Sequence, residues 1–411
     1  MSIGLKPPNG WKRIAIGDHA EIIFSSVDKK SYAGEKSVRL CNYTDVYYRN
    51  YIEHADGLME SSATDLEIKK FSLKKGDVLI TKDSETSDDI GVPALVTKDF
   101  DNVLCGYHLA IIRPTTGDLD SAFLSQVFRS HYMRKQLHRE ANGVTRFGLG
   151  VDTLKKLALL SPSLPTQVKI RDVLFAWDKA VETLSALIVS KSKERSGLMQ
   201  QLLTGKTRFK KFKNELWRTV KIGSLLAECD RYMTWSDDKA YRFASIRRRS
   251  GGLFDRGTFH GREVKTKVLK SLKAGDFVIS KRQVVHGAWA MVTKPFDGFG
   301  VSDEYDVLVN RDPKALDMRF FNYLSQTRWL WHLAYLASNG VHIEKLIFDF
   351  DDFAKEKVKI PPTVEEQAMI VDVLSACDRE IELLEKQLAA LKEQKRGLMQ
   401  KLLTGEVRVK L

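Results

Sequence analysis

Two matching stretches carry residue types that a nuclease would use. GDVLITK at 76–82 and GDFVISK at 275–281 each place an aspartate and a lysine at the ends of an apolar run. Metal-dependent nucleases hold their ions with several acidic ligands, and the second acidic residue is missing at the expected place. A strand that follows a Gly-Asp turn explains both stretches better, so we expect structure here rather than catalysis.

Other catalytic motifs are also missing from the sequence. IPPT at 360–363 lacks the polar and aromatic neighbours of an Asn/Asp-Pro-Pro-Tyr/Phe methyltransferase motif, and no GxxxxGK[ST] loop is present. The nine histidines show no metal-ligand spacing, and no cysteine forms a CxxC pair. We therefore expect no catalytic residue, metal or cofactor, and free thiols in a reducing cytoplasm at Cys41, Cys105, Cys229 and Cys377.

Basic and amide side chains gather in stretches that are predicted to be loops. Arginine suits guanine edges, and asparagine or glutamine suits adenine edges. In the second half, SIRRRSGG predicts a mobile basic turn, and SKRQVVHGAW follows a predicted strand. In the first half the matching place reads TKDSETSDD, whose Asp83 and Glu85 suit cytosine amino groups but repel phosphate. NGVTRFG and NGVHIEK recur shortly before the two long helices predicted below.

These loops supply the candidate DNA contacts. Ordinary turns and a solvated run of charge remain alternatives for each of them. Four tyrosines at 43–51 favour strand packing over base stacking, and KTRFKKFK at 206–213 is either a phosphate contact or a solvated linker. The candidates are Lys82, Ser84, Arg146, Arg247, Arg248, Arg249, Lys281, Arg282, Gln283 and His342.

A repeat indicates which elements position these loops. Ile170–Gly205 aligns without a gap to Ile370–Gly405, and 16 of the 36 positions are identical. Apolar residues recur at alternating spacings of four and three, which predicts two long helices with a heptad seam. Prolines precede each helix, and Gly205 and Gly405 stand where a left-handed residue ends a helix. The predicted seam contains Leu174, Trp177, Val181, Leu184 and Ile188 in the first copy, and Leu374, Cys377, Ile381, Leu384 and Leu388 in the second.

The repetition extends into the globular parts. Two stretches of the first half have counterparts in the second: LKKGDVLITK corresponds to LKAGDFVISK, and ALVTKDFD corresponds to AMVTKPFD. A tryptophan stands at the start of each unit, at Trp11 and Trp217. Short strands are predicted at LAIIRP and YDVLVN, and short helices at 121–137 and 318–336. We therefore expect an α+β fold with two tandem α/β domains. Because the second helix must run back toward the first unit, we expect the two helices to form an antiparallel coiled coil with a pseudo-two-fold axis.

Bulk composition points to the class of partner. The 411 residues carry 66 Lys and Arg against 53 Asp and Glu, a net charge of +13. This surplus favours a polyanion, most often nucleic acid. Neither a signal peptide nor an apolar stretch of membrane-spanning length is present in the sequence, so we expect a cytoplasmic protein without a membrane partner.

The helical repeats resemble a known family. IPPTVEEQAMIVDVLSACDREIELLEKQLAALKEQKRGLMQKLLTG closely resembles the second helical region of specificity subunits from Type I restriction–modification systems. LPTQVKIRDVLFAWDKAVETLSALIVSKSKERSGLMQQLLTG is similar to the central helical region of that family. The first copy departs from the pattern by lacking a glutamate before Gln167 and by carrying Lys191 in its seam.

The resemblance implies two target recognition domains, at 1–163 and 206–361, and helical spacers at 164–205 and 362–411. Each domain would read one half of a bipartite, asymmetric site in double-stranded DNA. The helices would set the spacing and dock two modification (methyltransferase) subunits, joined by restriction/translocase subunits, while the chain itself would be non-catalytic.

Other classes of protein remain open at this point. A related phage-defence methyltransferase complex would use an adaptor of the same architecture. A coiled-coil scaffold joining two protein-binding modules would not need the basic loops, and a self-contained DNA-modifying enzyme would need the missing motifs.

Overall fold

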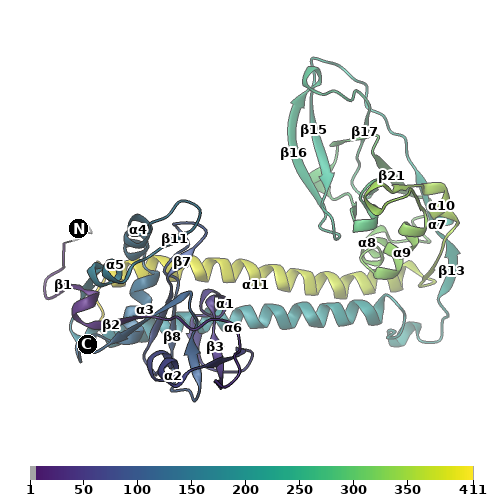
Figure 1. Ribbon diagram of the computed structural model, residues 1–411. Coiled ribbons are helices and arrows are strands. Elements are labelled where there is room, and N and C mark those ends of the chain that lie inside the picture. The colour runs from purple at the N-terminus through teal and green to yellow at the C-terminus, as the bar shows by residue number, and fades with distance from the viewer. Residues whose placement is uncertain (1–5, 411) are drawn as a thin grey trace. The chain divides into compact units, whose positions relative to one another are not determined.

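The computed structural model describes residues 6–410, which separate into two compact units. One unit comprises Met1–Ser185 together with Lys386–Leu411, and the other comprises Ala186–Glu385. Each unit contains sheets and short helices together with one half of each long helix (Figure 1). The predicted mixture of helix and strand is confirmed.

A five-stranded sheet forms the centre of the first unit. Its order is β2-β10-β6-β8-β4, and all neighbours are antiparallel except β4 and β8. The apolar runs predicted as strands are β6 and β10, and both are buried along most of their length. The strands are β2 (Ala20–Phe24), β4 (Tyr51–Ile52), β6 (Val78–Thr81), β8 (Pro93–Val96) and β10 (Leu109–Pro114).

Smaller sheets and five short helices complete the first unit. A three-stranded sheet has the order β5-β3-β9, and β1 pairs with β12. The strands are β1 (Lys12–Ala15), β3 (Lys36–Cys41), β5 (Met59–Ala63), β9 (Val103–Cys105) and β12 (Ala158–Ser161). The helices are α1 (Tyr43–Tyr48), α2 (Asp65–Phe71), α3 (Ser121–Arg129), α4 (His131–Glu140) and α5 (Val151–Lys156).

The second unit repeats this plan. Its sheet β14-β21-β18-β19 corresponds to β2-β10-β6-β8, and the sheet β16-β15-β20-β17 contains the equivalent of β5-β3-β9. β13 pairs with β24 as β1 pairs with β12. The strands of the two larger sheets and of this pair are β13 (Arg218–Lys221), β14 (Leu226–Glu228), β15 (Ala240–Ile246), β16 (Leu253–His260), β17 (Leu269–Ser271), β18 (Phe277–Ser280), β19 (Trp289–Met291), β20 (Gly300–Ser302), β21 (Tyr305–Asn310) and β24 (Lys357–Ile360).

The short helices of the second unit follow the same order. α8 and α9 occupy the places of α3 and α4, so helices stand where the sequence predicts them in both halves. The helices are α7 (Ile222–Leu225), α8 (Met318–Leu324), α9 (Arg328–Leu336) and α10 (Phe350–Lys355).

The two units differ most after the first strand of the three-stranded sheet. In the first unit, α1 and β4 lie between β3 and β5, whereas a short turn joins β15 directly to β16. The prediction that Tyr43, Tyr47 and Tyr48 pack in a strand is wrong. Asn42 and Asp45 form a capping box, which starts a helix at this point.

The two copies of the helical repeat form two long helices. α6 spans Leu164–Leu202 and α11 spans Val364–Thr404, about 58 Å and about 62 Å at 1.5 Å per residue. Asp178, early in α6, binds Lys395, late in α11. Arg195, late in α6, binds Asp378, early in α11. The helices therefore pack antiparallel, as the sequence predicts.

The predicted seam residues lie on the covered side of each helix. Leu174 and Leu374 are fully buried and enter the cores of the two units. The remaining seam residues are half-buried, namely Trp177, Val181, Leu184, Ile188, Cys377, Ile381, Leu384 and Leu388. Each core also takes up the last turn of the other helix, through Leu202 and Leu203 in one unit and Leu402 and Leu403 in the other.

Arg195 and Lys395 stand at the same position of the helical repeat and make equivalent ion pairs. The Asp178 carboxylate, 4% exposed, binds Lys395 and also accepts hydrogen bonds from Tyr51 Oη and Gln126 Nε2, each at 2.8 Å. At the equivalent place, Asp378 binds Arg195 and accepts from Tyr323 Oη at 2.6 Å. Each pair joins the two long helices to a globular part of the same unit.

A buried glutamine near the start of each long helix makes a second such connection. Gln167 Oε1 accepts from the Asp120 N–H, and its Nε2 donates to the Asp118 carbonyl. Gln367 makes the same contacts with the Asp317 N–H and the Ala315 carbonyl. Since both glutamines are fully buried, these bonds fix the entry of each helix.

The helix ends follow the sequence prediction, and the segment after the first helix is held at two of its basic residues. Gly205 and Gly405 have φ of 69° and 73°, and a Cβ would lie 3.2 Å from Trp217 at the first and 2.6 Å from Pro8 at the second. The basic segment at 206–213 is docked on its own unit, because Arg208 binds the buried Glu366 and Lys211 binds Glu365. Lys206, Lys210 and Lys213 stay exposed, so a phosphate contact by this segment remains a prediction.

Candidate nucleic-acid interface

In the first unit two loops that were predicted separately lie side by side. The chain leaves β6 at Lys82, and β7 (Asp83–Ser84) pairs with β11 (Phe147–Gly148). The Leu149 N–H donates to the Lys82 carbonyl at 2.9 Å. The fold therefore brings Lys82, Ser84 and Arg146 into one region.

Asp83 is the electrostatic centre of this region. Its carboxylate binds His108 Nδ1 at 2.8 Å, Arg146 Nη2 at 3.1 Å and Lys82 Nζ at 3.4 Å. Burial raises the pKa of Asp83, but the hydrogen bond from His108 and the charges of Lys82 and Arg146 outweigh it, so the pKa lies below its usual value. The charge of Asp83, which looked unfavourable for DNA, is thus neutralised within the protein, whereas Glu85 stays exposed.

The candidate side chains of this region differ in accessibility. Arg146 is 60% exposed, whereas the Lys82 side chain is 19% exposed and lies 5.5 Å from the Phe24 ring. Ser84 is buried, and its hydroxyl accepts a hydrogen bond from the Thr86 N–H. Arg146 is consequently the most accessible of these side chains to a ligand, and Ser84 is the least accessible.

The NGV loops of the two units share an unusual backbone. Gly143 and Gly340 have φ of 149° and 154°, and a Cβ on Gly143 would lie 1.9 Å from the Arg146 carbonyl oxygen. A glycine is required there. Val144 and Val341 follow and are 94% and 91% exposed. α5 and β12 stand between the first loop and α6, so the loop is farther from the helix entry than the sequence suggested.

The basic turn of the second unit is anchored. The Arg249 N–H donates to the His286 carbonyl at 2.7 Å, and the Ser250 N–H donates to the Gly287 carbonyl at 2.8 Å. Arg248 Nε donates to Gln283 Oε1 at 2.7 Å. The turn from β15 to β16 therefore packs against the segment that follows β18. Hydrogen bonds hold this turn in place, which differs from the mobile turn that the sequence predicted.

The third motif of the second unit reaches the same region. β22 (Ser338–Asn339) pairs with β23 (Ile347–Phe348), and the Phe348 N–H donates to the Lys281 carbonyl at 3.0 Å, as Leu149 does to Lys82. His342 is exposed at the start of the 3-10 helix Ile343–Lys345. In this helix Glu344 lies 3.8 Å from Arg248 and 3.5 Å from His286.

Not all basic candidates of the second unit are equally available. Lys281 Nζ binds the buried Asp306 at 3.0 Å, and Arg282 Nε binds Glu304 at 2.6 Å. The guanidinium of Arg247 lies 4.7 Å from the centre of the Phe254 ring. Within residues 6–410 the Arg249 side chain forms no hydrogen bond or ion pair, so its charge is free for a ligand.

Sequence reasoning missed two residues of this interface, His108 and Glu344, whereas His286 lies in SKRQVVHGAW, which the sequence singled out. A signal was available for His108, because it opens the predicted strand LAIIRP and so faces the end of the neighbouring strand, where its carbonyl accepts from the Lys82 N–H. Glu344 belongs to NGVHIEK, but its contact with Arg248 depends on a turn almost a hundred residues earlier.

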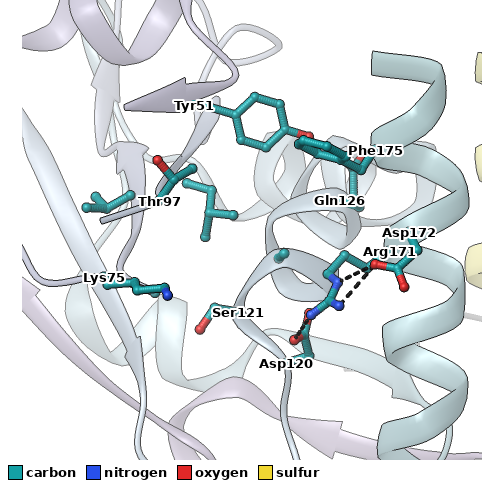
Figure 2. A pocket seen from close by; sticks show the side chains of 13 residues that line it. Tyr51, Lys75, Thr97, Asp120, Ser121, Gln126, Arg171, Asp172 and Phe175 are labelled. Atoms are coloured by element: carbon teal, nitrogen blue, oxygen red, sulfur yellow. Dashed lines mark hydrogen bonds and ion pairs between the residues drawn. The ribbon is translucent and has the colours of Figure 1, made fainter. Parts of the chain in front are cut away.

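A separate cavity in the first unit does not belong to this interface. It has a volume of about 580 Å³ and is lined by Tyr51, Lys75, Phe175 and Arg171, among others (Figure 2). Arg171 binds Asp120 at 2.8 Å and Asp172 at 3.0 Å, so its charge is neutralised. The repeat places Val371 and Ser375 at the positions of Arg171 and Phe175, and the cavity is therefore not common to both halves.

Clusters of metal-ligand residues are not found in the part of the chain that the structure describes. No group of three or more His, Cys, Asp or Glu side chains over residues 6–410 has an arrangement that could hold a metal ion. In the same range no helix is long and apolar enough to span a membrane.

Two tandem α/β domains with long antiparallel helices, and a loop cluster rich in basic residues in each half, define a class of DNA specificity proteins. A family model described as the Type I restriction modification DNA specificity domain matches residues 8–189 and 214–393. The chain belongs to this family. It is a specificity subunit of the Type I restriction–modification class, and such subunits are not catalytic themselves.

Curated relatives support this assignment along most of the chain. A putative Type I restriction enzyme MjaX specificity subunit from Methanocaldococcus jannaschii is 25% identical over 363 residues, which cover 84% of this chain and 81% of that protein. The Type I restriction enzyme MjaVIII specificity subunit from the same organism is 22% identical, over 99% of this chain and 95% of that protein.

Solved structures share the fold. The S subunit of a Type I system from M. genitalium has a TM-score of 0.57 at 14% identity, covering 98% of this chain and 99% of that one. The HsdS subunit from Thermoanaerobacter tengcongensis has a TM-score of 0.51 at 18% identity, covering 98% of each chain. A chain from a structural study of complex assembly in the Type I system has a TM-score of 0.57 at 16% identity, covering 98% and 100%.

Proposed function

We propose that this chain reads a bipartite, asymmetric DNA target, with one half-site bound by each globular unit. Residues 1–163 and 206–361 are the two target recognition domains in this proposal, and residues 164–205 and 362–411 are the helical spacers. The observation that carries the proposal is the repeated loop cluster: in each unit the loop after β6 or β18 joins the NGV loop through the same backbone hydrogen bond.

Different side chains on this common scaffold favour different half-sites. The first unit offers Arg146 beside Asp83 and His108, and the second offers Arg249, Arg248, Gln283 and His342. Arginine and glutamine read guanine and adenine edges in the major groove, and exposed cations bind phosphate. A pseudo-symmetric frame with unlike loops thus suits an interrupted target whose two halves differ.

The partners follow from the family rather than from a contact seen here. The proposed partners are double-stranded DNA, two modification subunits that carry out methylation, and restriction subunits. The pseudo-two-fold pairing of α6 and α11 would present two equivalent helical surfaces, one for each modification subunit.

A domain exchange tests the proposal. Residues 206–361 are replaced by the corresponding domain of another family member, and the chain is expressed with its modification subunit in a host whose methylome is then sequenced. We expect the methylated motif to change in one half and to keep its other half. Change in both halves, or in neither, would contradict the modular reading.

The salt dependence of binding separates this function from that of a protein scaffold. The affinity of the assembled complex for duplex DNA is expected to fall steeply as salt rises, because bound cations release counterions from the phosphates. A scaffold that binds proteins through its two modules would show no such DNA affinity.

A further inference from the structure

One helix of the first unit has an outer face made entirely of basic or imidazole side chains. In α4 the exposed residues are His131, Arg134, Lys135, His138 and Arg139. The other side of the helix is buried in the core through Tyr132, Met133 and Leu137. The exposed positions follow helical spacing, so these five side chains form one continuous stripe, which we call the α4 basic face.

The α4 basic face borders a hollow in the surface of the same unit. The hollow has a volume of about 390 Å³, and its lining includes Arg134, Lys135, Arg129 from the end of α3 and Arg396 from α11. Asp88 is the one carboxylate in the lining. The Arg129 Nε is buried and has no hydrogen-bond partner among residues 6–410. The other two nitrogens of Arg129 donate to Asn50 and to the Pro93 carbonyl. An anionic ligand is therefore indicated by the surplus of cations over carboxylates in the lining.

The charges of this face are poorly neutralised by the protein. Arg134 donates to the backbone carbonyl of Asp88 at 3.0 Å, and within the described chain neither Arg134 nor Lys135 forms an ion pair. Arg139 pairs with Glu140 at 3.2 Å. Cations that stand close together without counterions repel one another, and a row of phosphates removes this repulsion.

The fold does not require this charge. In α9, which occupies the equivalent place in the second unit, Trp331, His332, Tyr335 and Leu336 stand where α4 has Arg134, Lys135, His138 and Arg139. Tyr335 and Leu336 are 49% and 56% exposed. α9 keeps Arg328 and His332 at the places of His131 and Lys135, but it tolerates aromatic and apolar residues at the other three places. The continuous basic face therefore occurs in the first unit and not in the second.

We propose that the α4 basic face binds the phosphate backbone of the DNA next to the half-site read by the first unit. This inference rests on the proposed function. α4 ends at Glu140 and the chain continues directly into the NGV loop that carries Arg146, so the face is continuous with the candidate interface. It supplies affinity without base recognition, and its ligand is duplex DNA rather than an acidic protein surface.

Paired neutral substitutions test this inference in the assembled methyltransferase complex. Arg134→Gln with Lys135→Gln removes two charges from the α4 basic face. Lys69→Gln with Lys70→Gln removes two charges from α2, which lies on another side of the first unit (Figure 1) and whose two lysines are also exposed. Binding is measured over a range of salt, with a duplex that carries the motif found by methylome sequencing and with a scrambled duplex.

The expected result is a change in salt dependence without a change in specificity. Each lost phosphate contact reduces the slope of log affinity against log salt by about 0.9. The α4 pair should therefore lower this slope by about two, equally for both duplexes, while the α2 pair leaves it unchanged. Circular dichroism and complex assembly should match the wild type in both variants.

Two results would overturn the inference, and a third would point to the proposed function instead. An unchanged slope in a complex that assembles normally would rule out phosphate binding by α4. If the α4 variant loses the modification subunit, and the complex that still assembles keeps the wild-type slope of log affinity against log salt, the α4 basic face docks an acidic protein. If wild-type complex does not distinguish the two duplexes at all, the proposed function fails, and the slopes still report on α4.

Discussion

Arg249 lies in the short turn between β15 and β16, in a left-handed backbone conformation that arginine rarely adopts. Its φ is 58°, the next residue, Ser250, has φ of 55°, and both N–H groups are held by the segment at 286–287. Such backbone strain is maintained where the surrounding structure fixes it, often at functional sites. The side chain is exposed and has no partner within residues 6–410, so the turn presents a free guanidinium on a fixed backbone.

Arg249→Ala is accordingly expected to weaken recognition of one half-site. Loss of a bidentate contact with guanine costs about 1–3 kcal/mol, which is roughly a 5- to 150-fold loss of affinity. Competition binding with duplexes altered in one half or the other measures the effect. Discrimination should relax at the half-site of the second unit and stay intact at the other. Arg282→Ala, whose guanidinium already binds Glu304, is the matched control and should have a smaller effect.

At this scale the sequence identified the loops but not their chemistry. Asp83 looked like a repulsive charge because its partners His108 and Arg146 lie 25 and 63 residues away along the chain. Lys82 and Lys281 looked equivalent, yet the first binds Asp83 and the second binds Asp306. Spacing in sequence reports which residues share a loop, whereas the charge that a loop presents depends on residues brought in by the fold.

Among the elements, the long helices are joined by two equivalent ion pairs in addition to their apolar seam. Asp178 and Lys395 are 4% and 15% exposed at their side chains. A pair of this burial is weak evidence for net stability, but removal of one partner leaves a charge without compensation. The pair also receives Tyr51 and Gln126, so it links helix pairing to the position of the first globular part.

Asp178→Asn is expected to destabilise the protein by about 3 kcal/mol at neutral pH, because Lys395 is left buried without its counterion. Burial raises the pKa of Asp178, but the charge of Lys395 outweighs it and the pKa is lowered overall. The carboxylate therefore contributes stability above the ordinary pKa of 3.8, and this contribution is lost as pH falls through the lowered value.

Denaturant unfolding of wild type and variant between pH 3 and pH 8 measures this effect. The difference in unfolding free energy should be constant near neutral pH and should shrink in acid. Lys395→Met and the double variant complete a mutant cycle, in which the double variant should lose less than the sum of the two single changes. A difference that is additive, or that grows in acid, would contradict the role given to this pair.

The elements themselves were largely predictable. A seam repeated over several heptads, with proline before and glycine after, defines a helix locally, and α6 and α11 follow this pattern closely. α1 was missed because the aromatic residues of 43–48 suit a strand by composition, while the capping box of Asn42 and Asp45 decides for a helix. The docking of 206–213 was missed because Glu366, its partner, lies 158 residues from Arg208.

For the whole molecule, residues 8–11 and 405–408 lie together within one unit. Gly405 packs against Pro8 and Trp11, and Arg408 donates to the Asn9 carbonyl at 3.0 Å. Trp217 packs against Gly205 in the same manner, but there the chain continues from one to the other. The first unit is thus closed by contacts between residues 8–11 and 405–408, where the second unit has a covalent connection.

A circular permutant should consequently keep the fold. We expect a chain that starts at Asn214, joins Leu411 to Met1 by a short flexible linker and ends at Lys213 to direct methylation of the same motif. Its Tm should lie within about 4 °C of the wild type, since a cut at an exposed site costs little. Opening the chain between Ala186 and Leu187 is the control, and it should fail because it interrupts α6. Equal behaviour of the two permutants would contradict this account of the chain ends.

The discontinuity of the first unit also bears on how the protein is made. Ala186–Glu385 is one unbroken stretch, whereas the first unit needs residues from both extremes of the sequence. During synthesis on the ribosome, the half that emerges first must therefore wait for the last turns of α11, with the sockets for Leu402 and Leu403 open to solvent. In this state the apolar surface that a chaperone would recognise lies in the N-terminal part of the nascent chain, which was translated first.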